Sequence, residues 1–108
     1  MSGRYYLKVY RHSGRVVVAV CDEEILGKKF SDSKRGVVLD VSKDFYGGRL
    51  VDEKEVLDHI AVADIAVLTG RRIVELASRK GLAIKEVALE VEGQLHLQII
   101  KEVQEEQW

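Results

Sequence analysis

The chain has 108 residues, with 17 Lys and Arg against 18 Asp and Glu, and a formal net charge of -1. This length predicts one domain, residues 1–108, with one modest hydrophobic core. The balanced charge excludes the strong basic excess that would identify a nucleic-acid binder by itself. No window approaches a membrane span and no apolar leader opens the chain, so we expect neither a membrane partner nor a signal peptide.

The single cysteine, Cys21, excludes an internal disulfide and any site that needs several cysteines. A reducing cytoplasm is therefore the expected location. The many charged residues and the absence of asparagine are typical of proteins from hot environments, whereas the absence of proline is not.

The N-terminal part predicts strands. Residues 4–11 alternate between apolar and polar side chains, and residues 15–21 are rich in valine. The turn pair Ser13-Gly14 between them predicts a hairpin that pairs Leu7 with Val20 on an apolar face. Residues 36–42 predict a third strand, after a basic loop. The opposite face of the hairpin then presents Tyr6, Lys8, Tyr10 and Cys21.

The middle of the chain predicts helices. Asp52 has the features of a helix N-cap, with Glu55 three residues later as in a capping box. Apolar residues at helical spacing follow. We predict two helices within residues 52–80 with a break near Asp64, and one continuous helix is the alternative. Gly70 then lies inside a helix, where it costs about 1 kcal/mol relative to alanine.

The C-terminal part predicts a second hairpin, formed by residues 87–92 and 95–100. A three-residue loop pairs its apolar residues with one another, whereas a two-residue loop would set apolar residues against charged ones. The three-residue loop also places His96 opposite Glu90 on the outer face, where Gln98 lies beside it.

The predicted order is three strands, two helices and two strands, which defines an α+β domain. We expect a two-layer, largely antiparallel sheet of about five strands, made of two hairpins and one further strand. Two helices should pack on one of its faces, and the other face should be open to solvent. Residues 101–108 are expected to form a polar C-terminal tail.

The open face predicts a binding function. Lysine and arginine can contact phosphates, and tyrosine rings can stack on unpaired bases at about 1–3 kcal/mol per base. An ordinary solvated sheet face is the competing interpretation. The candidate nucleic-acid-binding residues are Arg4, Tyr6, Lys8, Tyr10, Lys28, Lys29, Lys34 and Arg35. We therefore expect a non-enzymatic binding module with RNA or a ribonucleoprotein as its partner.

A small enzyme is the second hypothesis, because Cys21 ends a strand, where reactive groups are often displayed. A nucleophilic cysteine needs a base or a positive charge nearby, and His96 is the candidate base. A half-buried structural cysteine is the competing interpretation. The candidate catalytic residues are Cys21, Asp22, Tyr46, His96 and Gln98. The histidines lack metal-ligand spacing and the glycines match no nucleotide-binding pattern, so we predict no metal and no cofactor.

A protein-partner adaptor or a homodimer is the third hypothesis. An exposed sheet edge, or the tail that ends in Trp108, would provide the contact surface.

Several stretches together resemble one family: residues 6–10, 19–28, 45–48, 74–77 and 96–98. They resemble the small archaeal family called domain of unknown function 424 over nearly the whole chain. The Cys-Asp and Phe-Tyr-Gly-Gly blocks are the most specific. The resemblance implies an archaeal cytoplasmic protein of α+β fold and no particular activity. The chain departs from the family pattern at Val67, where members tend to have asparagine, and at Leu95, where they tend to have proline.

Overall fold

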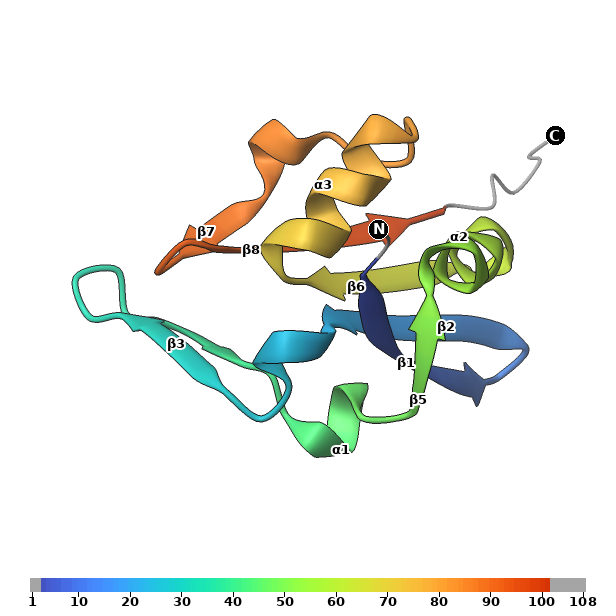
Figure 1. Ribbon diagram of the computed structural model, residues 1–108, viewed down its shortest axis with the longest axis horizontal. Helices are drawn as coiled ribbons and strands as arrows, with labels where there is room; N and C mark the ends of the chain where they lie inside the picture. Colours follow the sequence, from blue (N-terminus) through green and yellow to red (C-terminus); the bar gives the residue numbers. More distant parts are fainter. Residues whose placement is uncertain (1–2, 102–108) are drawn as a thin grey trace, which may run out of the picture.

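The computed structural model describes residues 3–101, and its main sheet has six strands in the order β5-β1-β2-β6-β8-β7 (Figure 1). These strands are β1 (Arg4–His12), β2 (Arg15–Asp22), β5 (Arg49–Asp52), β6 (Ile65–Thr69), β7 (Leu89–Val91) and β8 (Gln94–Ile100). Neighbours are antiparallel, except that β2 and β6 run parallel. A second, two-stranded sheet holds β3 (Lys29–Asp32) and β4 (Val37–Asp40), and we call it the ribbon.

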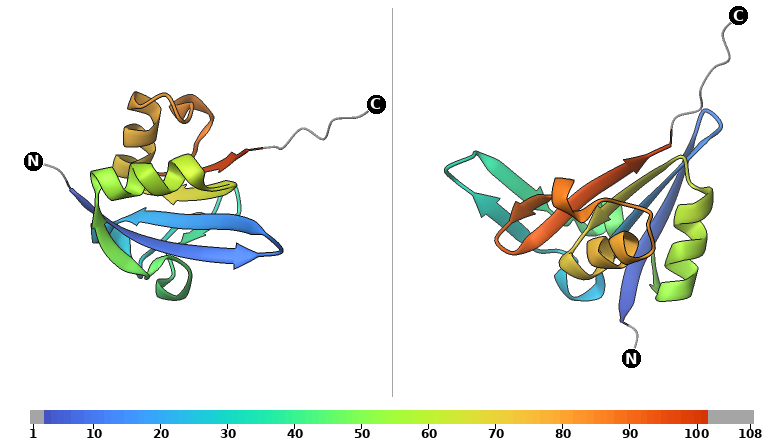
Figure 2. Two further views of the ribbon diagram at one scale, coloured as in Figure 1. Left: turned by 90° about the vertical axis from the view of Figure 1, so that its right-hand side faces the viewer. Right: turned by 90° about the horizontal axis from the view of Figure 1, so that it is seen from above.

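Two helices, α2 (Glu53–Val62) and α3 (Arg71–Arg79), lie on one face of the main sheet (Figure 2). The Asp52 side chain caps α2 as predicted, because it accepts a hydrogen bond from the backbone N–H of Glu55 at 2.9 Å. Within the described residues, no helix is long and apolar enough to cross a bilayer.

The apolar face of the first hairpin packs against these helices. The register pairs Leu7 with Val20, as predicted. Both side chains are buried, in one cluster with Ile60 of α2 and Leu76 of α3. Each such side chain stabilises the fold by roughly 1.5–3 kcal/mol. The predicted position of the two helices over the Leu7 face is confirmed.

The opposite face is covered, which corrects the expectation of an open face. The chain between β2 and β5 returns over it as η1 (Glu23–Ile25), the ribbon and α1 (Lys43–Tyr46) (Figures 1 and 2). These segments provide buried apolar side chains for this face, which itself contributes apolar residues. The resulting second core contains Ala19, Cys21, Ile25, Val41, Tyr46 and Val67.

Residues 65–69 form a strand, so the predicted helix over residues 64–80 is wrong in its first part. The segment is apolar and short, and it pairs with β2 on one side and β8 on the other. A run of this kind fits a strand buried on both faces as well as a buried helix. The helix α3 begins after Gly70, whose φ of 128° is a conformation that essentially only glycine adopts.

The sheet therefore has more strands than the five expected, and different ones. The strand predicted at residues 36–42 is the shorter β4, and it pairs with β3 in the ribbon instead of joining the main sheet. The residues of β3 belong to the basic segment expected to be a loop. β5, which no sequence pattern indicates, pairs with β1 and forms one edge of the main sheet.

The closing hairpin has a two-residue loop, Glu92-Gly93, so the three-residue loop is wrong. Both residues have positive φ, 50° and 82°, as a tight hairpin turn of this length requires. His96 consequently pairs with Leu89 rather than facing Glu90. Of the tail expected at residues 101–108, all but the first residue lie outside the described part of the chain.

Candidate functional site

A row of residues crosses the main sheet where the parallel strands β2 and β6 end. The register pairs Tyr6 with Cys21, Cys21 with Thr69, and Thr69 with His96. Residues paired across neighbouring strands point to the same face, here the face under the ribbon and α1. Two sequence candidates, Cys21 and His96, therefore lie on either side of Thr69, which no sequence motif indicates.

Thr69 joins Tyr46 and His96 through hydrogen bonds. Its Oγ1 lies 2.8 Å from the Tyr46 hydroxyl oxygen and 2.8 Å from Nδ1 of His96. A hydroxyl donates one proton and also accepts, so this chain of groups can be oriented in either direction. Burial lowers the pKa of His96 and raises the pKa of Tyr46, which keeps both side chains neutral at neutral pH. Tyr46, Thr69 and His96 form a neutral, hydrogen-bonded network.

Cys21 has the properties of a structural thiol. Its side chain is fully buried, and burial, followed by the charges of Asp22 and Glu24, raises the pKa of the thiol to about 12. Reactive cysteines instead have a lowered pKa and positive surroundings. The imidazole of His96 is hydrogen-bonded to Thr69 and not to the sulfur of Cys21. A cysteine-centred enzyme would therefore lack its nucleophile.

Asp22 holds the start of α3. Its two carboxylate oxygens accept hydrogen bonds from the backbone N–H groups of Arg72 and Ile73, each at 2.9 Å. These amides lack partners within the helix and lie at its positive end. Burial nevertheless raises the pKa of Asp22 to about 6. Gly70 lies directly against this carboxyl group, where any side chain would collide with it.

Gln98 lies on the same face of β8 as His96, two residues further along, and its side chain is exposed. Of the five candidate catalytic residues, Tyr46 and His96 are thus joined through Thr69, and Cys21 lies beside them. Asp22 caps α3, and Gln98 is on the surface.

Lys8 and Tyr10, expected to face outward, are engaged with α1. Lys8 Nζ donates a hydrogen bond to the carbonyl oxygen of Asp44 at 2.8 Å. The Tyr10 hydroxyl donates to the carbonyl oxygen of Phe45 at 2.7 Å, and its ring stacks on Phe45 with centroids 5.3 Å apart. Tyr6 is half-buried against the second core. These three side chains support α1 and the core.

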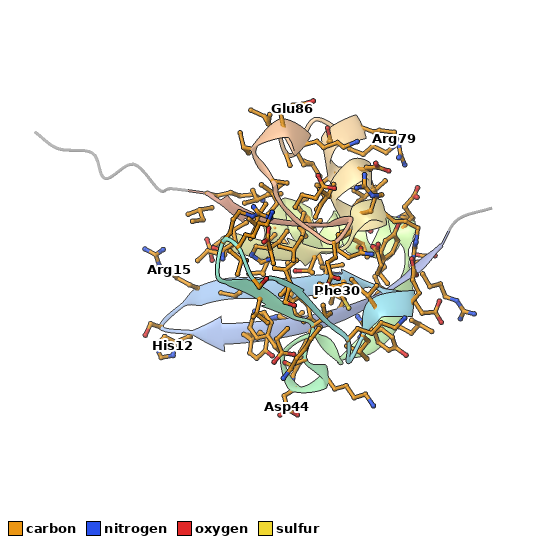
Figure 3. All side chains as sticks on the ribbon, turned by 90° about the vertical axis from the view of Figure 1, so that its left-hand side faces the viewer. His12, Arg15, Phe30, Asp44, Arg79 and Glu86 are labelled. Atoms are coloured by element: carbon orange, nitrogen blue, oxygen red, sulfur yellow. The ribbon has the colours of Figure 1, made fainter. Side chains whose placement is uncertain are left out.

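Residues 28–41 contain the ribbon and its ends, and we call them the ribbon segment. Its basic residues are exposed: Lys28, Lys29, Lys34 and Arg35. Residues 28–41 contain four of the 17 Lys and Arg but two of the 18 Asp and Glu, so the remainder of the chain is net negative. Phe30 lies on the ribbon in front of the main sheet (Figure 3) and packs against the second core. Arg4 is exposed at the start of β1, apart from the ribbon segment.

The chain is thus a mixed α/β protein with two helices on one face of its sheet and a basic ribbon on the other. The crystal structure of an uncharacterized conserved protein from Methanopyrus kandleri has the same fold, with a TM-score of 0.71 over 97% of this chain and 99% of that chain, at 22% sequence identity. A family model described as "Protein of unknown function (DUF424)" matches residues 10–101. The chain belongs to this family, which confirms the sequence resemblance. No curated protein matches the chain.

Proposed function

We propose that this protein is a non-enzymatic binding module that contacts RNA, free or within a ribonucleoprotein, through its ribbon segment. The observation that supports this function is the concentration of exposed lysines on a two-stranded element of positive charge, attached to a body of negative charge. Lysine side chains bind nucleic acid mainly by neutralising phosphates and releasing counterions. Lys28, Lys29 and Lys34 are the proposed phosphate contacts.

Hydrogen bonds close the base of the ribbon and tie it to the β7–β8 hairpin, which fixes the backbone that carries these lysines before any ligand binds. At its base, the backbone N–H of Val41 donates to the carbonyl oxygen of Lys28 at 2.9 Å. Further along, the N–H of Ser31 donates to a Glu92 side-chain oxygen at 2.9 Å, and the Arg35 guanidinium donates to the carbonyl oxygen of Glu90. Such preorganisation reduces the ordering cost of binding.

The tyrosines have a different role in this proposal from the one expected from the sequence. Tyr10 is stacked on Phe45 and hydrogen-bonded, so its ring is not open to a base. Binding would then depend on phosphates and shape more than on base stacking, and we expect little sequence preference.

The test compares the wild type with a ribbon variant, Lys28→Gln, Lys29→Gln and Lys34→Gln combined. A matched control, Arg11→Gln, Arg79→Gln and Lys80→Gln combined, removes the same charge from exposed sites elsewhere. Fluorescence anisotropy with labelled single-stranded and duplex RNA measures affinity between about 50 and about 200 mM salt.

If three lysines each neutralise one phosphate, wild-type affinity falls roughly 30-fold over this salt range. The ribbon variant should lose most of this salt dependence, and the control should keep it. Wild-type protein that binds neither RNA, or equal losses in both variants, would refute the proposal.

A further inference from the structure

The C-terminal half of β8 has an outer edge that no described strand covers. β6 pairs with β8 along its length from His96 to Ile100, whereas β7 pairs with it only as far as His96. Figure 2 shows β8 running on past the end of β7. The main sheet is therefore continued on one side of residues 97–100 and ends on the other side.

The backbone of this edge directs two residues outward. In an antiparallel ladder, successive residues direct their N–H and C=O groups alternately to the two sides. Lys101 donates its N–H to the carbonyl oxygen of Asp64 at 2.9 Å, on the β6 side. The residues at odd positions before it face β6 in the same way. Gln98 and Ile100 therefore direct their N–H and C=O groups away from the sheet.

An apolar groove with a volume of about 230 Å³ follows the same edge, between β8 and the segment before β7. The apolar residues that line it are Leu82, Ala83, Ile84, Val87, Leu97 and Ile99. Ile84 is 64% exposed and Val87 is 68% exposed. Aliphatic side chains gathered at this exposure are typical of a contact surface.

Two other strands at the edges of the sheets carry charged side chains. β5, at the opposite edge of the main sheet, contains Arg49 and Asp52, and β3 in the ribbon contains Lys29 and Asp32. Charges at an edge oppose pairing with a further strand. Residues 97–100, Leu-Gln-Ile-Ile, contain no charged side chain. This edge is therefore chemically open to pairing.

We propose that a second copy of this chain docks on this edge, β8 against β8, about a twofold axis at Ile99. In an antiparallel pair centred there, Gln98 lies opposite the partner subunit's Ile100, and both residues direct their backbone groups toward the other copy. The same two residues complete each other's hydrogen bonds, as a twofold interface requires. Docking would also cover Ile84 and Val87, and it does not depend on RNA binding.

The small size of this edge sets the expected affinity. A standard stable interface buries about 800 Å² on each partner, and four strand residues with a shallow groove offer less than that. We therefore expect a reversible dimer with a dissociation constant of about 10–100 μM, far weaker than an obligate one.

Two variants test the interface in independent ways. Gln98→Pro removes one outward N–H and leaves the pairing with β6 in place, since proline is tolerated on an edge strand. Val87→Lys adds a charge to the groove without changing the backbone. The controls are Val38→Lys and Val62→Lys, which place the same charge on valines that are 61% and 74% exposed elsewhere.

Sedimentation velocity from about 5 to about 200 μM should show wild-type protein passing from monomer to dimer. Val87→Lys and Gln98→Pro should raise the dissociation constant at least tenfold, with far-UV circular dichroism unchanged for Val87→Lys, and both controls should dimerise as the wild type does. A wild type that stays monomeric overturns the proposal. So does a dimer that survives Val87→Lys, whatever becomes of Gln98→Pro.

Discussion

Replacing Gly70 by alanine tests how Asp22 holds the start of α3. Gly70 has a φ of 128° and lies against the Asp22 carboxyl group. An alanine methyl group would push this carboxyl group away from the two backbone N–H groups that donate hydrogen bonds to it. We expect Gly70→Ala to destabilise the protein strongly, although it adds a single methyl group.

The expected loss has two parts. A non-glycine residue in this conformation costs about 1–3 kcal/mol. Displacing the carboxylate weakens its bonds to the N–H groups of Arg72 and Ile73, and a hydrogen bond to a charged group contributes about 1.5–3 kcal/mol. If one bond is lost, the sum is about 2.5–6 kcal/mol, which at about 4 °C per kcal/mol would lower the melting temperature by roughly 10–25 °C.

Gly81 provides the matched control because it follows the other end of α3. Its φ is 75°, and a methyl group there would meet no atom within 4 Å. Gly81→Ala should therefore cost only the conformational penalty of about 1–2 kcal/mol. Urea unfolding measures both losses. In an Asp22→Ala background, Gly70→Ala should cost less than in the wild type, because the collision is gone. Equal losses for Gly70→Ala and Gly81→Ala would refute the reasoning.

Three further predictions concern the network beside Cys21. The Cys21 thiol, with its pKa raised to about 12, should resist iodoacetamide in native protein and react at once in denaturant; native labelling would contradict its burial. Thr69→Val should cost about 1–3 kcal/mol in urea unfolding, because the buried Tyr46 hydroxyl loses its partner, whereas Thr69→Ser should cost less. Burial lowers the pKa of His96 in the folded protein. As pH falls below about 6.5, His96 therefore binds a proton in the unfolded chain before it does so in the folded protein. The contribution of His96 to stability should therefore decline in that window, where the raised pKa of Asp22 acts with the opposite sign, and urea midpoints of His96→Gln should lack the His96 contribution.

Local chemistry predicts those parts of the fold that short-range signals control. The turn pair Ser13-Gly14 sets the register of the first hairpin, and Asp52 sets the start of α2. In both cases the residues that decide the conformation lie within a few positions of one another. The sidedness of the hairpin follows from its register, so the position of α2 and α3 over Leu7 could also be predicted.

Long-range contacts decide the parts that the sequence does not predict. The apolar run at residues 65–69 suits a strand or a buried helix, and only pairing with β2 and β8 selects the strand. The closing hairpin needs Glu92 at a positive φ, which glutamate rarely adopts, so the sequence favours a longer loop there.

The candidate site also has a part that the sequence indicates and a part that only long-range contacts decide. Cys21, Tyr46 and His96 stand out as chemical types, and the fold gathers them on one face of the sheet. Thr69 joins Tyr46 and His96, but a threonine at the end of an apolar run does not stand out in the sequence as a candidate site residue. The return of the chain over this face also covers part of the Tyr10 side chain, because α1 supplies the Phe45 ring on which it stacks.

The parallel pairing of β2 with β6 constrains the order of folding. These strands cannot be joined by a tight turn, and the hydrogen bond from Val16 to Asp64 links residues 48 positions apart. The first hairpin can form within microseconds from neighbouring residues, but the middle of the sheet must wait until the ribbon, β5 and α2 have been synthesised and looped back. β6 therefore joins the sheet late in folding. Fragments that end before residue 69 should lack a cooperative unfolding transition.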